Sequence, residues 1–141
     1  MFFSRCFLLR NIIIPNTITK IGHRAFYGCS SLTDIIIPNG VTEIGKYAFW
    51  GCTSLKNINI PECVTKMEKK TFYECSSLTN IIIPNNITEI GSGAFLGCSS
   101  LISRVSEKKY LYIRLKVHFS TCTKSVIQNY CTALLYSLYF Q

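Results

Sequence analysis

Residues 35–55 read IIIPNGVTEIGKYAFWGCTSL, and nearly the same phrase begins at residues 12, 58 and 81. Pro38, Phe49, Cys52 and Leu55 each recur in the other three copies, always at a step of 23 residues. A constant period of about 20–50 residues is typical of solenoids, in which each repeat forms one turn and buries its apolar face against its neighbours. The sequence therefore predicts a coil of stacked, similar turns.

Within one repeat, the segment before the proline alternates like a strand. Ile35 and Ile37 alternate with Asp34 and Ile36, and isoleucine favours strands. Pro38 has no N–H to donate, so pairing should end there. We expect parallel strands at residues 11–14, 34–37, 57–60 and 80–83.

Repetition also predicts how the interior is filled. Equivalent residues of successive turns should stack at the inter-strand spacing of about 4.8 Å, so that each type packs against its own copies. The phenylalanines at 26, 49, 72 and 95 should form one such column. The cysteines at 6, 29, 52, 75 and 98 form another, and we interpret them as buried free thiols rather than as disulfides.

The repeated phrase, L-x-x-I-x-I-P-x-x-(V/I)-T-x-I-G-x-x-A-F-x-G-C-x-x-L, closely resembles the 23-residue BspA-like subclass of leucine-rich repeats. The resemblance covers residues 9–101, with a fragment at 2–8, and it implies an α/β-type repeat solenoid made mostly of short parallel strands and loops. The third copy departs from the phrase at Met67, Glu68, Thr71 and Glu74, which predicts a looser turn there.

Composition and register divide the chain into two parts. With 48% hydrophobic and 16% charged residues, the 141-residue chain is typical of a packed protein. We assign residues 1–101 to the solenoid and residues 102–141 to a non-repeat basic tail, because Arg104 occupies a slot that should hold an inward isoleucine. Apolar and polar residues alternate over residues 110–119, which predicts a strand. Apolar residues recur about every four positions over residues 125–139, which predicts an amphipathic helix. The tail is either a C-terminal cap or an unrelated extension.

The sequence holds no motif for catalysis, for a cofactor or for a metal, so we expect a non-enzymatic protein without cofactors. It also has no run long enough for a transmembrane helix and no convincing signal peptide. Arg24, Lys46, Lys69 and Lys70 fall in neighbouring slots and could form a basic stripe. We interpret the stripe as a solvated face and expect no nucleic acid partner.

The outward slots of the strands are the candidate binding site. They form a column of Asn and Asp beside a column that is mostly Ile, at positions Asn11, Ile13, Asp34, Ile36, Asn57, Asn59, Asn80 and Ile82. Exposed isoleucines in a row favour an interaction surface. The resemblance implies a surface or adhesion-type scaffold that binds a protein partner on this face, and it is the only indication of a cell-surface location. The alternative is a structural fragment or truncated copy of a longer array, without binding of its own.

Overall fold

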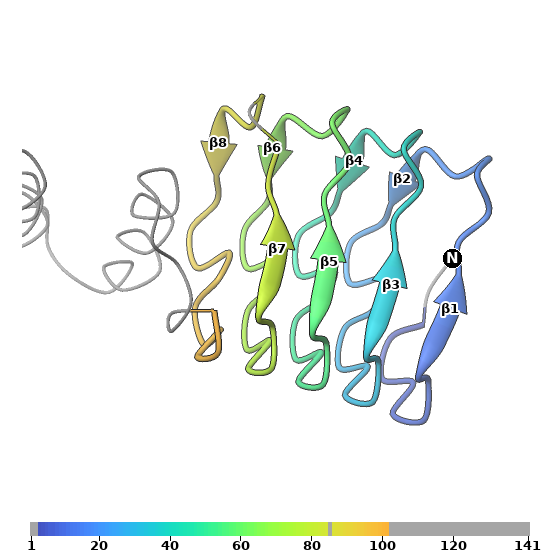
Figure 1. Ribbon diagram of the computed structural model, residues 1–141, viewed down its shortest axis with the longest axis vertical. Helices are drawn as coiled ribbons and strands as arrows, with labels where there is room; N and C mark the ends of the chain where they lie inside the picture. Colours follow the sequence, from blue (N-terminus) through green and yellow to red (C-terminus); the bar gives the residue numbers. More distant parts are fainter. Residues whose placement is uncertain (1–2, 85, 102–141) are drawn as a thin grey trace, which may run out of the picture.

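A computed structural model describes residues 3–84 and 86–101, which form a solenoid of parallel strands (Figure 1). Four long strands lie side by side in the order β1, β3, β5, β7: β1 (Asn11–Ile13), β3 (Asp34–Ile36), β5 (Asn57–Asn59) and β7 (Asn80–Ile82). They pair in parallel, and each residue faces the residue 23 positions later, as Asn57 faces Asn80. The predicted solenoid and its four strands are confirmed.

Each turn also contains a second, shorter strand that the sequence did not predict. These are β2 (Lys20–Ile21), β4 (Glu43–Ile44), β6 (Lys66–Met67) and β8 (Glu89–Ile90). Among the described residues they form two separate parallel pairs, β2 with β4 and β6 with β8. Two-residue strands are too short to give a recognisable period, and the second residue of each of these strands is buried.

Phenylalanine side chains form a continuous stack through the centre of the coil. Phe26 and Phe49 have ring centroids 5.2 Å apart and planes within 8° of parallel, and Phe49 and Phe72 are 5.3 Å apart and within 6°. Phe3 and Phe95 extend the stack at its two ends, each at 5.6 Å. Leucine, isoleucine and valine side chains surround the stack and complete the core. The predicted phenylalanine column is therefore confirmed.

The cysteine column lies beside the stack and makes hydrogen bonds that the sequence did not suggest. Cys52 Sγ donates to the Phe26 carbonyl oxygen at 3.2 Å, and Cys75 Sγ donates to that of Phe49 at 3.1 Å. Burial raises the pKa of both thiols above its ordinary value, so they keep the proton that they donate. The column therefore links successive turns through S–H donors as well as filling space.

Cys29, Cys52, Cys75 and Cys98 are buried free thiols, as predicted, but Cys6 is exposed. The prediction is wrong for Cys6. Each buried cysteine of the column donates to a carbonyl oxygen 26 residues before it, as Cys52 does to Phe26 O, and the residues that the structure describes place no such turn before Cys6.

The third turn is predicted to be loose, but its core is as tightly packed as that of the other turns. Met67 and Thr71 both have 0% exposure. Thr71 adds a hydroxyl and a methyl group to the Cβ of the alanine found in the other turns, and its hydroxyl donates to the Glu68 carbonyl oxygen at 2.8 Å. The buried hydroxyl is thus satisfied, and the substitution leaves the core intact.

The backbone hydrogen bonding between successive short strands, by contrast, is interrupted at the third turn. Gly45 N donates to Ile21 O at 2.9 Å and Gly91 N to Met67 O at 2.7 Å, but within the described residues no such bond joins Glu68 to Ile44. A Cβ added at Gly45 would lie 2.7 Å from His23 N, and one added at Gly91 would lie 2.6 Å from Glu68 C. Side chains in this slot point at the preceding backbone, so Glu68 keeps β6 away from β4.

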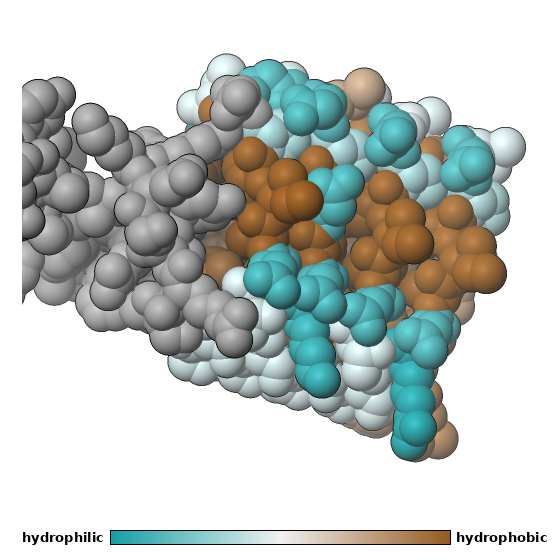
Figure 2. All heavy atoms as spheres, viewed as in Figure 1, coloured by the Kyte–Doolittle hydropathy of each residue, from teal (hydrophilic) through white to brown (hydrophobic). Residues whose placement is uncertain are grey.

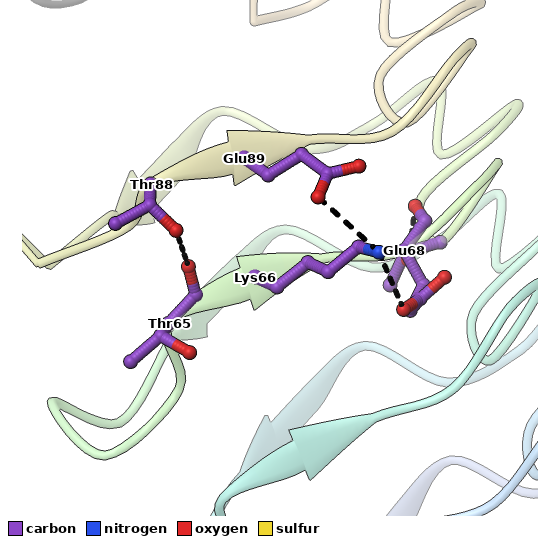
Figure 3. A network of polar contacts seen from close by, with 6 residues as sticks. Thr65, Lys66, Glu68, Thr88 and Glu89 are labelled. Atoms are coloured by element: carbon purple, nitrogen blue, oxygen red, sulfur yellow. Dashed lines mark hydrogen bonds and ion pairs between the residues drawn. The ribbon is translucent and has the colours of Figure 1, made fainter.

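On the other side of this interruption, polar side-chain contacts connect the two strands of the β6–β8 pair (Figure 3). Lys66 Nζ lies 3.3 Å from Glu89 Oε2 and 3.4 Å from Glu68 Oε1, and Thr88 donates to the Thr65 carbonyl oxygen at 3.1 Å. The carboxylates raise the pKa of Lys66, with the Glu89 hydrogen bond as the largest cause. Lys66 therefore joins the two strands of the β6–β8 pair and also holds Glu68 at its edge.

Residues 102–141 lie outside the described residues, so the predicted strand and helix of the tail and the boundary at residue 101 stay predictions. Within residues 3–84 and 86–101 there is no helix, and strands, turns and loops account for the whole coil. The fold is thus the leucine-rich-repeat coil that the sequence predicts.

Candidate protein-binding surface

The eight predicted site residues all lie on the outward side of the long-strand sheet, and all are exposed. The alternation of the strands explains this placement, since the middle residue of each strand points toward the core. Ile35, Ile58 and Ile81 are buried in these middle positions. The structure therefore brings the predicted residues together in two adjacent columns, one on each side of the buried residue of each strand.

The isoleucine column is the most exposed apolar feature of this face. Ile13 is 94% exposed, Ile36 is 83% exposed and Ile82 is 64% exposed. Figure 2 shows an apolar band that crosses β1, β3 and β7 and is interrupted by hydrophilic colour over β5, where Asn59 stands. Parallel pairing places Asn59 beside Ile82. The column is thus a row of apolar side chains with one polar position.

The Asn/Asp column satisfies part of its own hydrogen-bonding capacity. Asn57 Nδ2 donates to Asp34 Oδ1 at 2.9 Å, and Asn80 Nδ2 donates to Asn57 Oδ1 at 2.8 Å. These bonds run along the sheet and hold the amide groups in one orientation. The column therefore offers an ordered polar edge beside the isoleucines, and Figure 2 shows it as a hydrophilic row.

A second surface lies on the turns that follow the short strands, where Arg24, Lys46 and Lys69 are exposed and Lys70 is half-buried. The stripe predicted there contains aromatic side chains that the sequence analysis did not single out. Tyr27, Trp50 and Tyr73 occupy one slot of successive turns, with ring centroids 5.5 Å and 4.6 Å apart. The recurrence of aromatic residues one position after the core phenylalanine was the signal that could have revealed them.

The described residues show neither a metal-ligand cluster nor a membrane-spanning helix. No group of three or more His, Cys, Asp or Glu side chains is placed to hold a metal ion in residues 3–84 and 86–101. In the same part of the chain, no helix is long and apolar enough to cross a membrane.

Comparison with known proteins agrees with this fold. The chain matches the family described as BspA type Leucine rich repeat region over residues 1–126, in six copies. It belongs to this family. Repeats of the BspA type generally serve as protein-interaction scaffolds rather than as enzymes. A search of curated proteins finds no match.

Several solved structures are similar to this BspA-type chain, among them two leucine-rich repeat proteins. The T. pallidum leucine rich repeat protein TpLRR is 31% identical with a TM-score of 0.71, over 79% of this chain and 50% of that protein. A leucine-rich repeat protein from Bacteroides ovatus ATCC 8483 is 39% identical with a TM-score of 0.66, over 70% of this chain and 25% of that protein. The chain thus spans half the length of the first and a quarter of the second.

Proposed function

We propose that the chain is a non-enzymatic scaffold of the surface or adhesion type that binds a protein partner through the outward face of β1, β3, β5 and β7. The observation that carries the proposal is the row of exposed isoleucines, Ile13, Ile36 and Ile82. The resemblance to surface proteins that adhere to host or matrix proteins supports the adhesion role.

The chemistry of this face suits a protein surface of mixed polarity. Asp34 is the only charged residue among the eight, so the face offers little attraction to a polyanion. The isoleucines supply apolar area to bury, and the bonded amide column fixes polar groups beside them. Since the backbone ladder holds every position, little conformational entropy is lost on binding.

The main alternative is a structural segment of a longer repeat array whose binding surface lies elsewhere. The greater length of TpLRR and of the Bacteroides ovatus protein supports it. Genomic sequence on both sides of the coding region, read in all frames, would show whether further 23-residue repeats adjoin the chain.

The binding test uses Ile36→Lys with Asn59→Lys. Both side chains are exposed, so the fold should persist while binding to a panel of immobilised matrix proteins falls by about tenfold or more. The measurement is surface plasmon resonance on the purified chain, with circular dichroism to confirm folding.

The matched control adds the same charge elsewhere, with Asn39→Lys and Ser92→Lys. Both positions are exposed, and the slot of Ser92 already holds Lys46 and Lys69 in other turns. Equal loss of binding in the two double variants would contradict the proposed face. A wild-type chain that binds no protein on the panel would favour the structural alternative.

A further inference from the structure

Four aromatic rings and two cations form a cluster on the turns that follow the short strands. We call this set the cation–aromatic cluster: Arg24, Tyr27, Tyr47, Trp50, Lys70 and Tyr73. None of these residues belongs to the strand face. The four aromatic residues are half-buried, so part of each remains open to solvent.

Each cation of the cluster lies against two rings. Arg24 Cζ is 5.6 Å from the centroid of Tyr27 and 5.4 Å from that of Tyr47. Lys70 Nζ is 4.8 Å from Trp50 and 4.6 Å from Tyr73. Contacts of this kind hold a long side chain in place, which lowers the entropy that it loses when it binds an anion.

One slot of the cluster has a positive backbone φ, as the same slot does in the other described turns. Arg24, Tyr47 and Lys70 have φ of 56°, 62° and 52°, in the left-handed region that favours glycine. The same slot in the fourth turn holds Gly93, with φ of 66°. Because Gly93 has the same geometry, the positive φ belongs to the turn of the repeat, and glycine can replace the larger side chains at this slot.

Charge around the cluster is mostly positive. Arg5, Lys46 and Lys69 are exposed nearby in the same turn segments, and Arg5 Cζ lies 6.0 Å from the Tyr27 ring. Two carboxylates occur in these segments, at Glu68 and Glu74, and Glu68 is engaged by Lys66. The cluster thus presents two cations, two turns apart and each held against aromatic rings, within a mostly positive surface, and its ligand should be an extended anion.

We propose that the cation–aromatic cluster binds an acidic polysaccharide, with Arg24 and Lys70 contacting its carboxylate or sulfate groups and the exposed parts of the aromatic side chains packing against sugar rings. Successive turns repeat at about 4.8 Å, close to the length of one residue in an extended sugar chain, so neighbouring turns can contact neighbouring sugars. Single-stranded nucleic acid would instead need free ring faces for its bases. Here Arg24 and Lys70 already cover ring faces.

The test removes both cations with Arg24→Gly and Lys70→Gly. Glycine suits the positive φ at both positions, as at Gly93, so this variant keeps the fold. The probes are dextran sulfate, polygalacturonate, neutral dextran and oligo-dT, at about 0.15 M ionic strength. We expect the wild-type chain to bind the two acidic polysaccharides and the variant to bind them about tenfold more weakly or worse. The slope of log affinity against log salt should fall by about two.

The matched control removes the same charge elsewhere, with Arg10→Gln and Lys56→Gln, two exposed residues that precede β1 and β5. It should retain binding to within about twofold, and so should the strand-face variant Ile36→Lys with Asn59→Lys. Trp50→Leu, a residue type found in the same slot at Leu96, should weaken binding without unfolding the chain.

Three results would overturn the proposal. One is no binding of either acidic polysaccharide by the wild-type chain. Another is equal loss in the cluster variant and in the Arg10 and Lys56 control, which would mean that net charge alone attracts the polymer. The last is tighter binding of oligo-dT than of both polysaccharides, which would assign the cluster to nucleic acid.

Discussion

The long-strand ladder runs unbroken from β1 to β7, whereas the short-strand ladder divides between β4 and β6. Both ladders belong to the same turns and share the same phenylalanine stack. The division therefore does not arise from a defect in the core, which is fully packed at Met67 and Phe72.

The difference shows that the two ladders depend on different features of the repeat. Long strands need an apolar residue at the centre of each strand, and every copy supplies one. Short strands also need glycine directly after them, because a Cβ in that slot meets the backbone of the preceding turn. The third turn supplies the apolar residue of its long strand at Ile58, but Glu68 occupies the slot after its short strand, where the other short strands are followed by glycine.

The largest expected effect comes from breaking what both ladders share. Phe49→Ala removes the ring that stacks on Phe26 and Phe72, and it should lower the free energy of unfolding by about 3–5 kcal/mol. Urea denaturation followed by circular dichroism measures this change. Ile36→Ala, on the exposed strand face, is the control and should change stability by less than about 0.5 kcal/mol. A smaller loss for Phe49→Ala than for Ile36→Ala would rule out a common core under the two ladders.

A smaller effect should follow from breaking an intact short-strand pair. Gly91→Ala places a methyl group 2.6 Å from Glu68 C, so β8 must move away from β6 at a cost of about 1–3 kcal/mol. Hydrogen exchange should show that the amide of residue 91, which donates to Met67 O, loses protection.

Gly40→Ala is the matched control for Gly91→Ala. The nearest atom to its added Cβ, Asn16 O, is 3.7 Å away, which is an ordinary contact. Its stability should stay within about 0.5 kcal/mol of wild type. If Gly91→Ala were equally harmless, the slot would not require glycine.

The smallest change in stability should accompany repair of the divided ladder. Glu68→Gly allows β6 to approach β4, and the amide of residue 68 should gain protection from hydrogen exchange as it bonds to Ile44 O. The net change in unfolding free energy should stay within about 1 kcal/mol, because the new backbone bond is offset by the greater chain entropy of glycine. An amide at residue 68 that exchanges as fast as in wild type would show that Glu68 does not cause the division.

Much of the fold could be predicted because the period of 23 residues assigns each slot a neighbour of the same type. The strands, the phenylalanine column and the exposure of Ile13 and Asn57 all follow from that register. What the register could not supply was the direction of a side chain relative to the preceding turn. The effect of Glu68 therefore appeared only in the structure.

Of the cation–aromatic cluster, the sequence predicted the cations Arg24 and Lys70 as part of a basic stripe, but not the rings that they contact, and for a different reason. Its slots look variable along the chain, since Arg24, Tyr47 and Lys70 are equivalent by register but differ in kind. Only the stacking of turns makes Arg24 a neighbour of Tyr47 and Lys70 a neighbour of Trp50. A slot that holds the same residue type in every copy is easy to recognise in the sequence. A slot that holds different, complementary types in successive copies is not.

The constant offset between paired residues also bears on how such a gene can change. Asn11 faces Asp34 and Lys20 faces Glu43, both at a distance of 23 residues. Recombination that inserts or deletes one whole repeat leaves every column in register, whereas any other length would move polar residues into the core. Copy number can therefore drift without loss of the fold. A repeat that carries Glu68 would therefore interrupt the short-strand ladder wherever it is inserted in the array.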